Sequence, residues 1–152
     1  MYAKDTKVSA QKSRQEIERT LERYGATGFM YGWEGASAML AFAMSERRVK
    51  FILPLPEVND FAVTPQGQQR NPSAMETAHA QAIRQRWRAL ALVIKAKLEA
   101  VETGIVTFED EFLSHIMMPD GSTVGDAVRP KIALAYETGE MQRLLPSYHG
   151  EH

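Results

Sequence analysis

The stretch that decides the fold is residues 73–103, and its centre reads RQRWRALALVIKAKL from Arg84 to Leu98. Ser73 and Glu76 form a capping box at its start, and Gly104 follows its end. Its apolar residues recur at intervals of three and four, the spacing of one helical face. They are Ile83, Trp87, Leu90, Ile94, Leu98 and Val101. The pattern predicts one long central helix that carries the core.

The same helix carries positive charge on both flanks of its apolar face. At about 100° per residue, Arg84, Arg88 and Lys95 fall within about 40° of one another, while Arg86 and Lys97 fall on the other flank. Cations in such a row can follow a phosphate backbone. A solvated helix face is the alternative interpretation.

Composition bounds the class of protein. The chain has 152 residues, a net charge of −1 and no cysteine. This length predicts one domain with its own core, and the absence of cysteine excludes disulfides and thiolate metal sites. The charge balance provides no overall attraction to nucleic acid or to a membrane, so any such affinity must come from local segregation of charge. We expect a soluble, intracellular protein that does not associate with membranes.

The residues before the central helix predict a sheet. Alternating apolar positions and turn residues indicate three antiparallel strands, with tight turns at Glu34-Gly35 and at residues 45–47. The strands are expected at residues 27–33, 36–44 and 48–55. Residues 57–72 show no periodicity and predict a long loop. The fold class is therefore α+β, a three-stranded antiparallel meander packed against one long central helix.

Shorter helices are expected at both ends of a single domain spanning residues 10–140. An N-terminal helix is predicted over residues 10–24, with Ser13 and Glu16 as a second capping box. After Gly104, a short helix begins at Thr107, and a last helix over residues 123–137 is kinked or split at Pro130. The flanking segments, residues 1–9 and 141–152, are predicted to be flexible.

A search for catalytic chemistry finds no signature. The histidines lack metal-ligand spacing, and no nucleophile elbow, Walker or dinucleotide-binding glycine pattern occurs. Glu111 and His115 stand four residues apart and could begin a two-ligand metal site, but a surface pair is the better interpretation. The acidic residues 109–111 fit the first turn of a helix. We expect no catalytic residue, no metal and no cofactor, and predict that the chain is not an enzyme.

The basic residues suggest nucleic acid as a partner instead. Arg47, Arg48 and Lys50 of the third strand are expected to point in the same direction as the helix flank, with Arg70 of the long loop as an auxiliary contact. The predicted nucleic-acid-binding residues are Arg48, Lys50, Arg70, Arg84, Arg88 and Lys95. Tyr31 or Trp33 would stack on bases.

Several short motifs resemble those of a family of small bacteriophage and actinobacterial proteins, a family that brings no assigned activity. The motifs are RYGA at 23–26, LPLP at 53–56, TPQG at 64–67, RQRWRAL at 84–90 and KAKLEAVE at 95–102. The element order also resembles the core of phage and eukaryotic single-strand annealing proteins, which lay single-stranded DNA in a basic groove beside the sheet and form rings. Double-stranded-RNA-binding domains share this order too, but their Lys-rich entry to the last helix is absent here.

These resemblances imply a phage-type protein in the cytoplasm of a bacterial host cell. The leading hypothesis is a homo-oligomer that binds or anneals single-stranded DNA through the basic helix flank. The alternative is an accessory, counter-defence protein that binds a host protein or sequesters a nucleotide, with residues 64–70 closing a pocket in an oligomer. A metal- or carboxylate-dependent hydrolase is the least favoured hypothesis.

Overall fold

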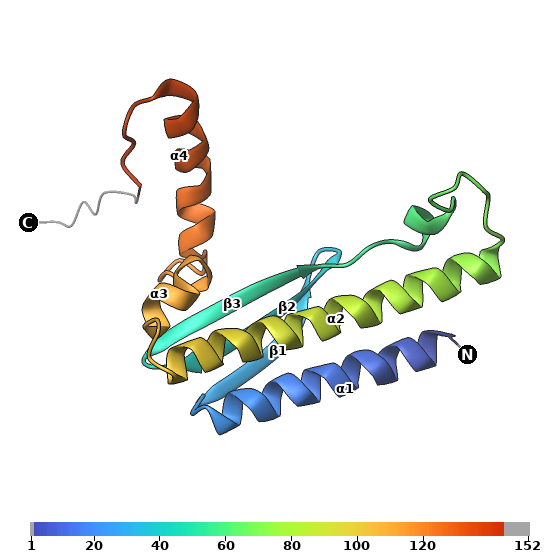
Figure 1. Cartoon of the computed structure of the whole chain (residues 1–152), viewed down its shortest axis with the longest axis horizontal. Helices are drawn as coiled ribbons and strands as arrows, with labels where there is room; N and C mark the ends of the chain where they lie inside the picture. Colours follow the sequence, from blue (N-terminus) through green and yellow to red (C-terminus); the bar gives the residue numbers. More distant parts are fainter. Residues whose placement is uncertain (1, 145–152) are drawn as a thin grey trace, which may run out of the picture.

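The computed structural model describes residues 2–144, with side chains from Ala10 onward, and it confirms the α+β class (Figure 1). The chain forms α1 Tyr2–Arg23, β1 Gly28–Glu34, β2 Ser37–Met44, β3 Arg47–Pro54, the 3-10 turn η1 Val58–Phe61, α2 Pro72–Glu102, α3 Phe108–Phe112, the 3-10 turn η2 Leu113–His115 and α4 Val124–Thr138. Within residues 2–144, no helix has the length and apolar character needed to cross a membrane.

The three strands form the predicted antiparallel sheet in the order β1-β2-β3. Glu34 pairs with Ser37, so the first turn consists of Gly35 and Ala36, one residue later than expected. The second turn consists of Ser45 and Glu46, whose φ angles of 53° and 62° are both left-handed. Two consecutive left-handed residues match the right-handed twist of a tight hairpin. These short turns keep the three strands in one register.

The core lies between one face of the sheet and a layer of two helices. Figure 1 shows α1 and α2 side by side across the sheet, running in the same direction. The sheet contributes alternate residues of each strand, as the period of two requires, and both helices contribute their apolar stripes. Fully buried side chains include Ile17, Leu21, Leu40, Val49, Trp87, Ile94, Leu98 and Phe112. The predicted apolar face of the central helix is therefore the centre of the core.

The start of α2 differs from the prediction. Asn71, and not Ser73, is the N-cap: its side-chain Oδ1 accepts a hydrogen bond from the Ala74 amide at 2.8 Å. Pro72 occupies the first helical position, where its missing N–H costs nothing. The predicted box of Ser73 and Glu76 is wrong because both residues already lie inside the helix. Gly104, with a φ of +84°, follows the C-terminal end as expected.

The N-terminal helix is longer than predicted. It begins at Tyr2 rather than near residue 10, so the backbone of residues 2–9 is helical where a flexible segment was expected. Ser13 and Glu16 consequently lie in the middle of α1, and they do not cap it. Of the segment expected to be flexible at the C-terminus, residues 141–144 lie outside any helix or strand, and residues 145–152 lie outside the described part of the chain.

The 57–72 loop has internal order. It contains η1 and an isolated bridge between Val63 and Gln69. Arg70 closes it, because the Nη1 of its guanidinium donates to the Phe61 and Val63 carbonyls at 3.1 and 3.3 Å. The loop is therefore a small hydrogen-bonded unit leading into α2.

The C-terminal helices begin where the sequence predicted. Thr107 caps α3 through a hydrogen bond from the Asp110 amide, and Thr123 and Asp126 form a reciprocal capping box at α4. Pro130 does not split α4, which continues to Thr138 and ends at Gly139 with a φ of +75°. Figure 1 shows α4 standing away from the layer of sheet and helices.

Candidate nucleic-acid interface

The structure separates the six predicted binding residues into three groups. They are Arg48 and Lys50 on β3, Arg70 in the 57–72 loop, and Arg84, Arg88 and Lys95 on α2. On β3, Val49 and Phe51 are buried under the helices, so the alternating Arg48 and Lys50 point to the opposite face of the sheet. The expectation that they share a direction with the arginines of α2 is wrong for this reason. The side chain of Lys50 is 14% exposed, and its Nζ lies 3.8 Å from Glu34 Oε2.

Lys50 and Arg70 also have structural partners. The Nζ of Lys50 donates to the Gly121 carbonyl at 3.3 Å, which ties the 118–122 turn to the edge of the sheet. Arg70 donates to the two carbonyls of its own loop. Both cations therefore hold the fold together, and neither lies beside the arginines of α2.

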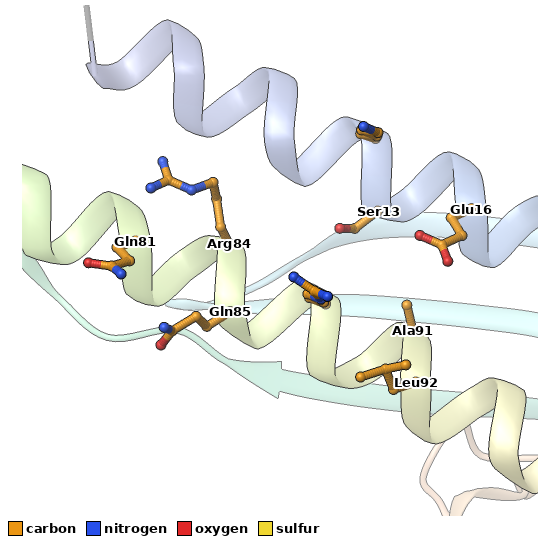
Figure 2. Close-up of a pocket in the computed structure, with 9 residues that line it drawn as sticks. Ser13, Glu16, Gln81, Arg84, Gln85, Ala91 and Leu92 are labelled. Atoms are coloured by element: carbon orange, nitrogen blue, oxygen red, sulfur yellow. The ribbon is translucent and has the colours of Figure 1, made fainter.

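Arg84 and Arg88 of α2 line a groove between the two long helices (Figure 2). Its volume is about 590 Å³. Figure 2 shows Ser13, Glu16 and Arg84 reaching into the space between the helices. The lining consists of Lys12, Ser13 and Glu16 from α1 and of Gln81, Arg84, Gln85, Arg88, Ala91 and Leu92 from α2. The groove thus presents cations, amides and a hydroxyl, with one carboxylate.

The groove cations differ from the other basic residues in their pairing. Lys97, on the other flank of α2, lies 3.4 Å from Glu111 Oε1, and Arg47 lies 3.5 Å from Glu109. Within residues 10–144, no carboxylate lies within ion-pair distance of Lys12, Arg84 or Arg88. Their positive charge is therefore free to attract an anion.

Lys95 has the same angular position as Arg84 and Arg88 but does not line the groove. It lies two turns beyond Arg88 along α2 and is exposed to solvent. A nucleic-acid strand that left the groove along α2 would meet Lys95 next. Lys95 extends the basic row without forming part of the cavity.

The aromatic residues proposed for stacking have different environments. Tyr31 is half-buried: its ring lies 5.4 Å from the Trp87 ring, and the Arg14 guanidinium lies 3.9 Å above it. A cation in this position is attracted by the negative face of the ring. Trp33 is 65% exposed and contacts Tyr31 edge-on at 5.9 Å. Only Trp33 of this pair offers a free face for stacking.

His115 and Glu111 show no metal-binding arrangement. The imidazole of His115 stacks on Phe51 at 4.0 Å, while Glu111 pairs with Lys97. Partial burial lowers the pKa of His115, and the nearby Lys97 and Arg129 lower it further. No group of three or more metal-ligating side chains occurs among the described residues. His115 is thus a ring packed into the core near α3.

Comparison of the chain with protein families, with curated proteins and with solved structures finds no match. The resemblance to phage and actinobacterial proteins and to annealing proteins therefore remains a prediction.

Sequence reasoning missed the α1 side of the groove. Lys12, Ser13 and Glu16 lie on a helix that was interpreted as solvated, and nothing local shows that it neighbours α2. Ile17 and Leu21, which are 1% exposed, were recognised as its docking stripe. The residues beside that stripe were the available signal for a shared groove.

Proposed function

We propose that the chain binds single-stranded nucleic acid without catalysis, along the groove between α1 and α2. The observation that carries the proposal is the convergence on one groove of Lys12, Arg84 and Arg88, which form no ion pair within residues 10–144. Phosphate contacts dominate nucleic-acid affinity and require cations of this kind. The proposal retains Arg84 and Arg88 of the predicted site, with Lys95 as an extension.

The size of the groove suits a short length of one strand. A volume of about 590 Å³ falls in the range of small-ligand sites, roughly 300–1,000 Å³. Such a space accommodates a short length of sugar-phosphate backbone. Gln81, Gln85 and Ser13 would donate hydrogen bonds to phosphate or sugar oxygens. Bases would stay outside the groove, and Trp33, the predicted stacking residue, is not among the residues that line it.

The lining supports binding rather than reaction. Glu16 is the one carboxylate among the nine lining residues, and no histidine is among them. General acid–base chemistry commonly uses a pair of such groups. The expected homo-oligomer and the expected location in a bacterial host cell are further proposals that follow the leading hypothesis.

The test is binding of a labelled oligothymidylate, measured by fluorescence anisotropy at low salt. Arg88→Glu turns one attraction at about 4 Å into a repulsion, each worth about 1 kcal/mol in water, so affinity should fall about 30-fold. Arg86→Glu is the matched control, because Arg86 is also exposed on α2 but lies outside the groove. Its affinity should change less than about threefold.

The nucleotide-sequestering alternative is separated in the same experiment. A bound mononucleotide raises the melting temperature, so a thermal shift with a mononucleotide and no binding of the oligonucleotide would favour the alternative. Absence of oligonucleotide binding at low salt, or equal losses in the Arg88 and Arg86 variants, would contradict the proposed function.

A further inference from the structure

The helix α4 has an apolar stripe whose C-terminal part is not covered by residues 10–144. The stripe was predicted as Val124, Val128, Ile132 and Tyr136, and the first two residues are partly buried against the body of the fold. Exposure then rises to 46% at Ile132 and 89% at Tyr136. Gly125 is the one buried residue of this helix. Isolated helices of about 15 residues are marginal in water and depend on packing, so the stripe needs a partner.

The sheet also has an uncovered face. Both long helices lie on one side, and within the described part of the chain no helix covers the alternate residues on the other side. Met30 is 55% exposed and Ile52 is 42% exposed on this side. A hollow of about 170 Å³ lies over β1 and β2. It is lined by Gly28, Phe29, Met30, Ala41, Phe42, Ala43, Arg48 and Met117. Apart from Arg48, the residues that line the hollow are apolar or glycine, and Lys50 projects from the same face of the sheet.

The helix and the open face match in size. At about 1.5 Å per residue, the 15 residues of α4 span about 22 Å. The 8 residues of β2 or β3 span about 26 Å at about 3.3 Å each. Figure 1 shows α4 rising away from the sheet of its own chain.

We propose that α4 packs on the open sheet face of a second copy of this chain, and that two copies exchange these helices around a two-fold axis. Tyr136 of one copy enters the hollow between Met30 and Met117 of the other. A two-fold axis makes both contacts identical and leaves neither surface unpaired.

Charge favours a second copy as the occupant, because the unpaired groups on the two surfaces have opposite sign. Arg48 at the hollow and Glu137 beside Tyr136 both lack ion pairs in the described residues and have opposite charge.

This dimer leaves the α1–α2 groove open, because the groove lies on the helix-covered side of each sheet. The inference therefore stands independently of nucleic-acid binding, and it is tested on full-length protein freed of nucleic acid by nuclease treatment.

The first test is molar mass by size-exclusion chromatography with light scattering. We expect twice the 17.1 kDa of one chain, and a two-fold fall in mass for Tyr136→Glu. Ile105→Glu is the control, because Ile105 is 81% exposed outside both surfaces and its substitution should leave the mass doubled. Circular dichroism checks that each variant is folded. A monomeric parent chain, or a Tyr136→Glu variant that keeps the doubled mass, would overturn the proposal.

The second test uses the absence of cysteine. A tagged chain with Met30→Cys is mixed with an untagged chain with Tyr136→Cys and oxidised, and a disulfide-linked heterodimer is expected. Replacing the second chain by Ile105→Cys should abolish the link. If the Met30→Cys and Tyr136→Cys chains form a dimer but no disulfide between these two cysteines, the dimer has another interface. A chain carrying both Met30→Cys and Tyr136→Cys that links internally shows α4 on its own sheet. Either result contradicts the exchange.

Discussion

Neutralising one groove arginine by Arg84→Gln should change the salt dependence of oligonucleotide binding by a predictable amount. Three cations without ion pairs line the groove, Lys12, Arg84 and Arg88. Each phosphate contact on a single strand contributes about −0.7 to the slope of log affinity against log salt concentration. Three contacts therefore predict a slope of about −2.1. Between about 50 and 200 mM salt, the parent chain should lose about 18-fold in affinity.

The Arg84→Gln variant retains two contacts, so its slope should be about −1.4 and its loss over the same range about sevenfold. Arg47→Gln is the control, because Arg47 already pairs with Glu109 and lies outside the groove. Anisotropy titrations at four or more salt concentrations measure each slope. A parent slope near zero, or an equal change of slope in both variants, would refute the assignment of phosphate contacts to the groove.

Two further predictions concern stability. Asn71→Ala should lower the free energy of unfolding by about 1 kcal/mol, since it removes the N-cap of α2. Ser73→Ala should have little effect. Urea titration compares the two variants, and an equal loss of stability in both would show that Asn71 is not the cap. The pKa of His115 is lowered from 6.5, mainly because partial burial disfavours the charged ring, so the folded state binds a proton less readily than the unfolded chain. The stability contributed by neutral His115 should be fully present above about pH 6.5 and decline as the pH falls below it. The melting temperature of the parent chain should therefore exceed that of His115→Gln by less at pH 5 than at pH 7. A difference that stays constant over this range would contradict the lowered pKa. Hydrogen bonds from Ser122 lower the pKa of Asp120 from 3.8, and hydrogen bonds from Thr123 lower the pKa of Asp126 from the same value. The stability that these two carboxylates contribute should therefore decline only as the pH falls below about 3.8.

The sequence predicted the elements well because their signals are local. The apolar stripe of α2 repeats with the period of a helix, and Trp87, Ile94 and Leu98 are buried as expected. The strands differ from prediction by about one residue at their ends, because turn residues and alternation mark them directly. The N-cap of α2 was misplaced, although Asn71 before Pro72 carried the correct signal: proline is favoured at the first helical position.

The candidate site was harder to predict, because it depends on which faces meet. Because neighbouring residues of a β-strand point to opposite faces, a buried Val49 already implies that Arg48 points away from the helices. The sequence pattern could therefore have excluded the cations of β3 from the site. The contribution of Lys12 was not, because about 70 residues separate it from Arg84 and only the packing of α1 beside α2 brings them together. The ion pairs were equally unpredictable from the sequence, because Lys97 pairs with Glu111 only where α3 folds back against α2.

By itself, the sequence determined the α+β class, the three strands, the apolar face of α2 and most helix ends, because these follow from periodicity and turn chemistry within a few neighbouring residues. The tertiary structure decided which cations form no ion pair among the described residues, where the groove lies, and that residues 10–144 leave the end of the α4 stripe uncovered. Those properties depend on distances between residues far apart in the chain, which burial and helix packing set and which no local pattern encodes.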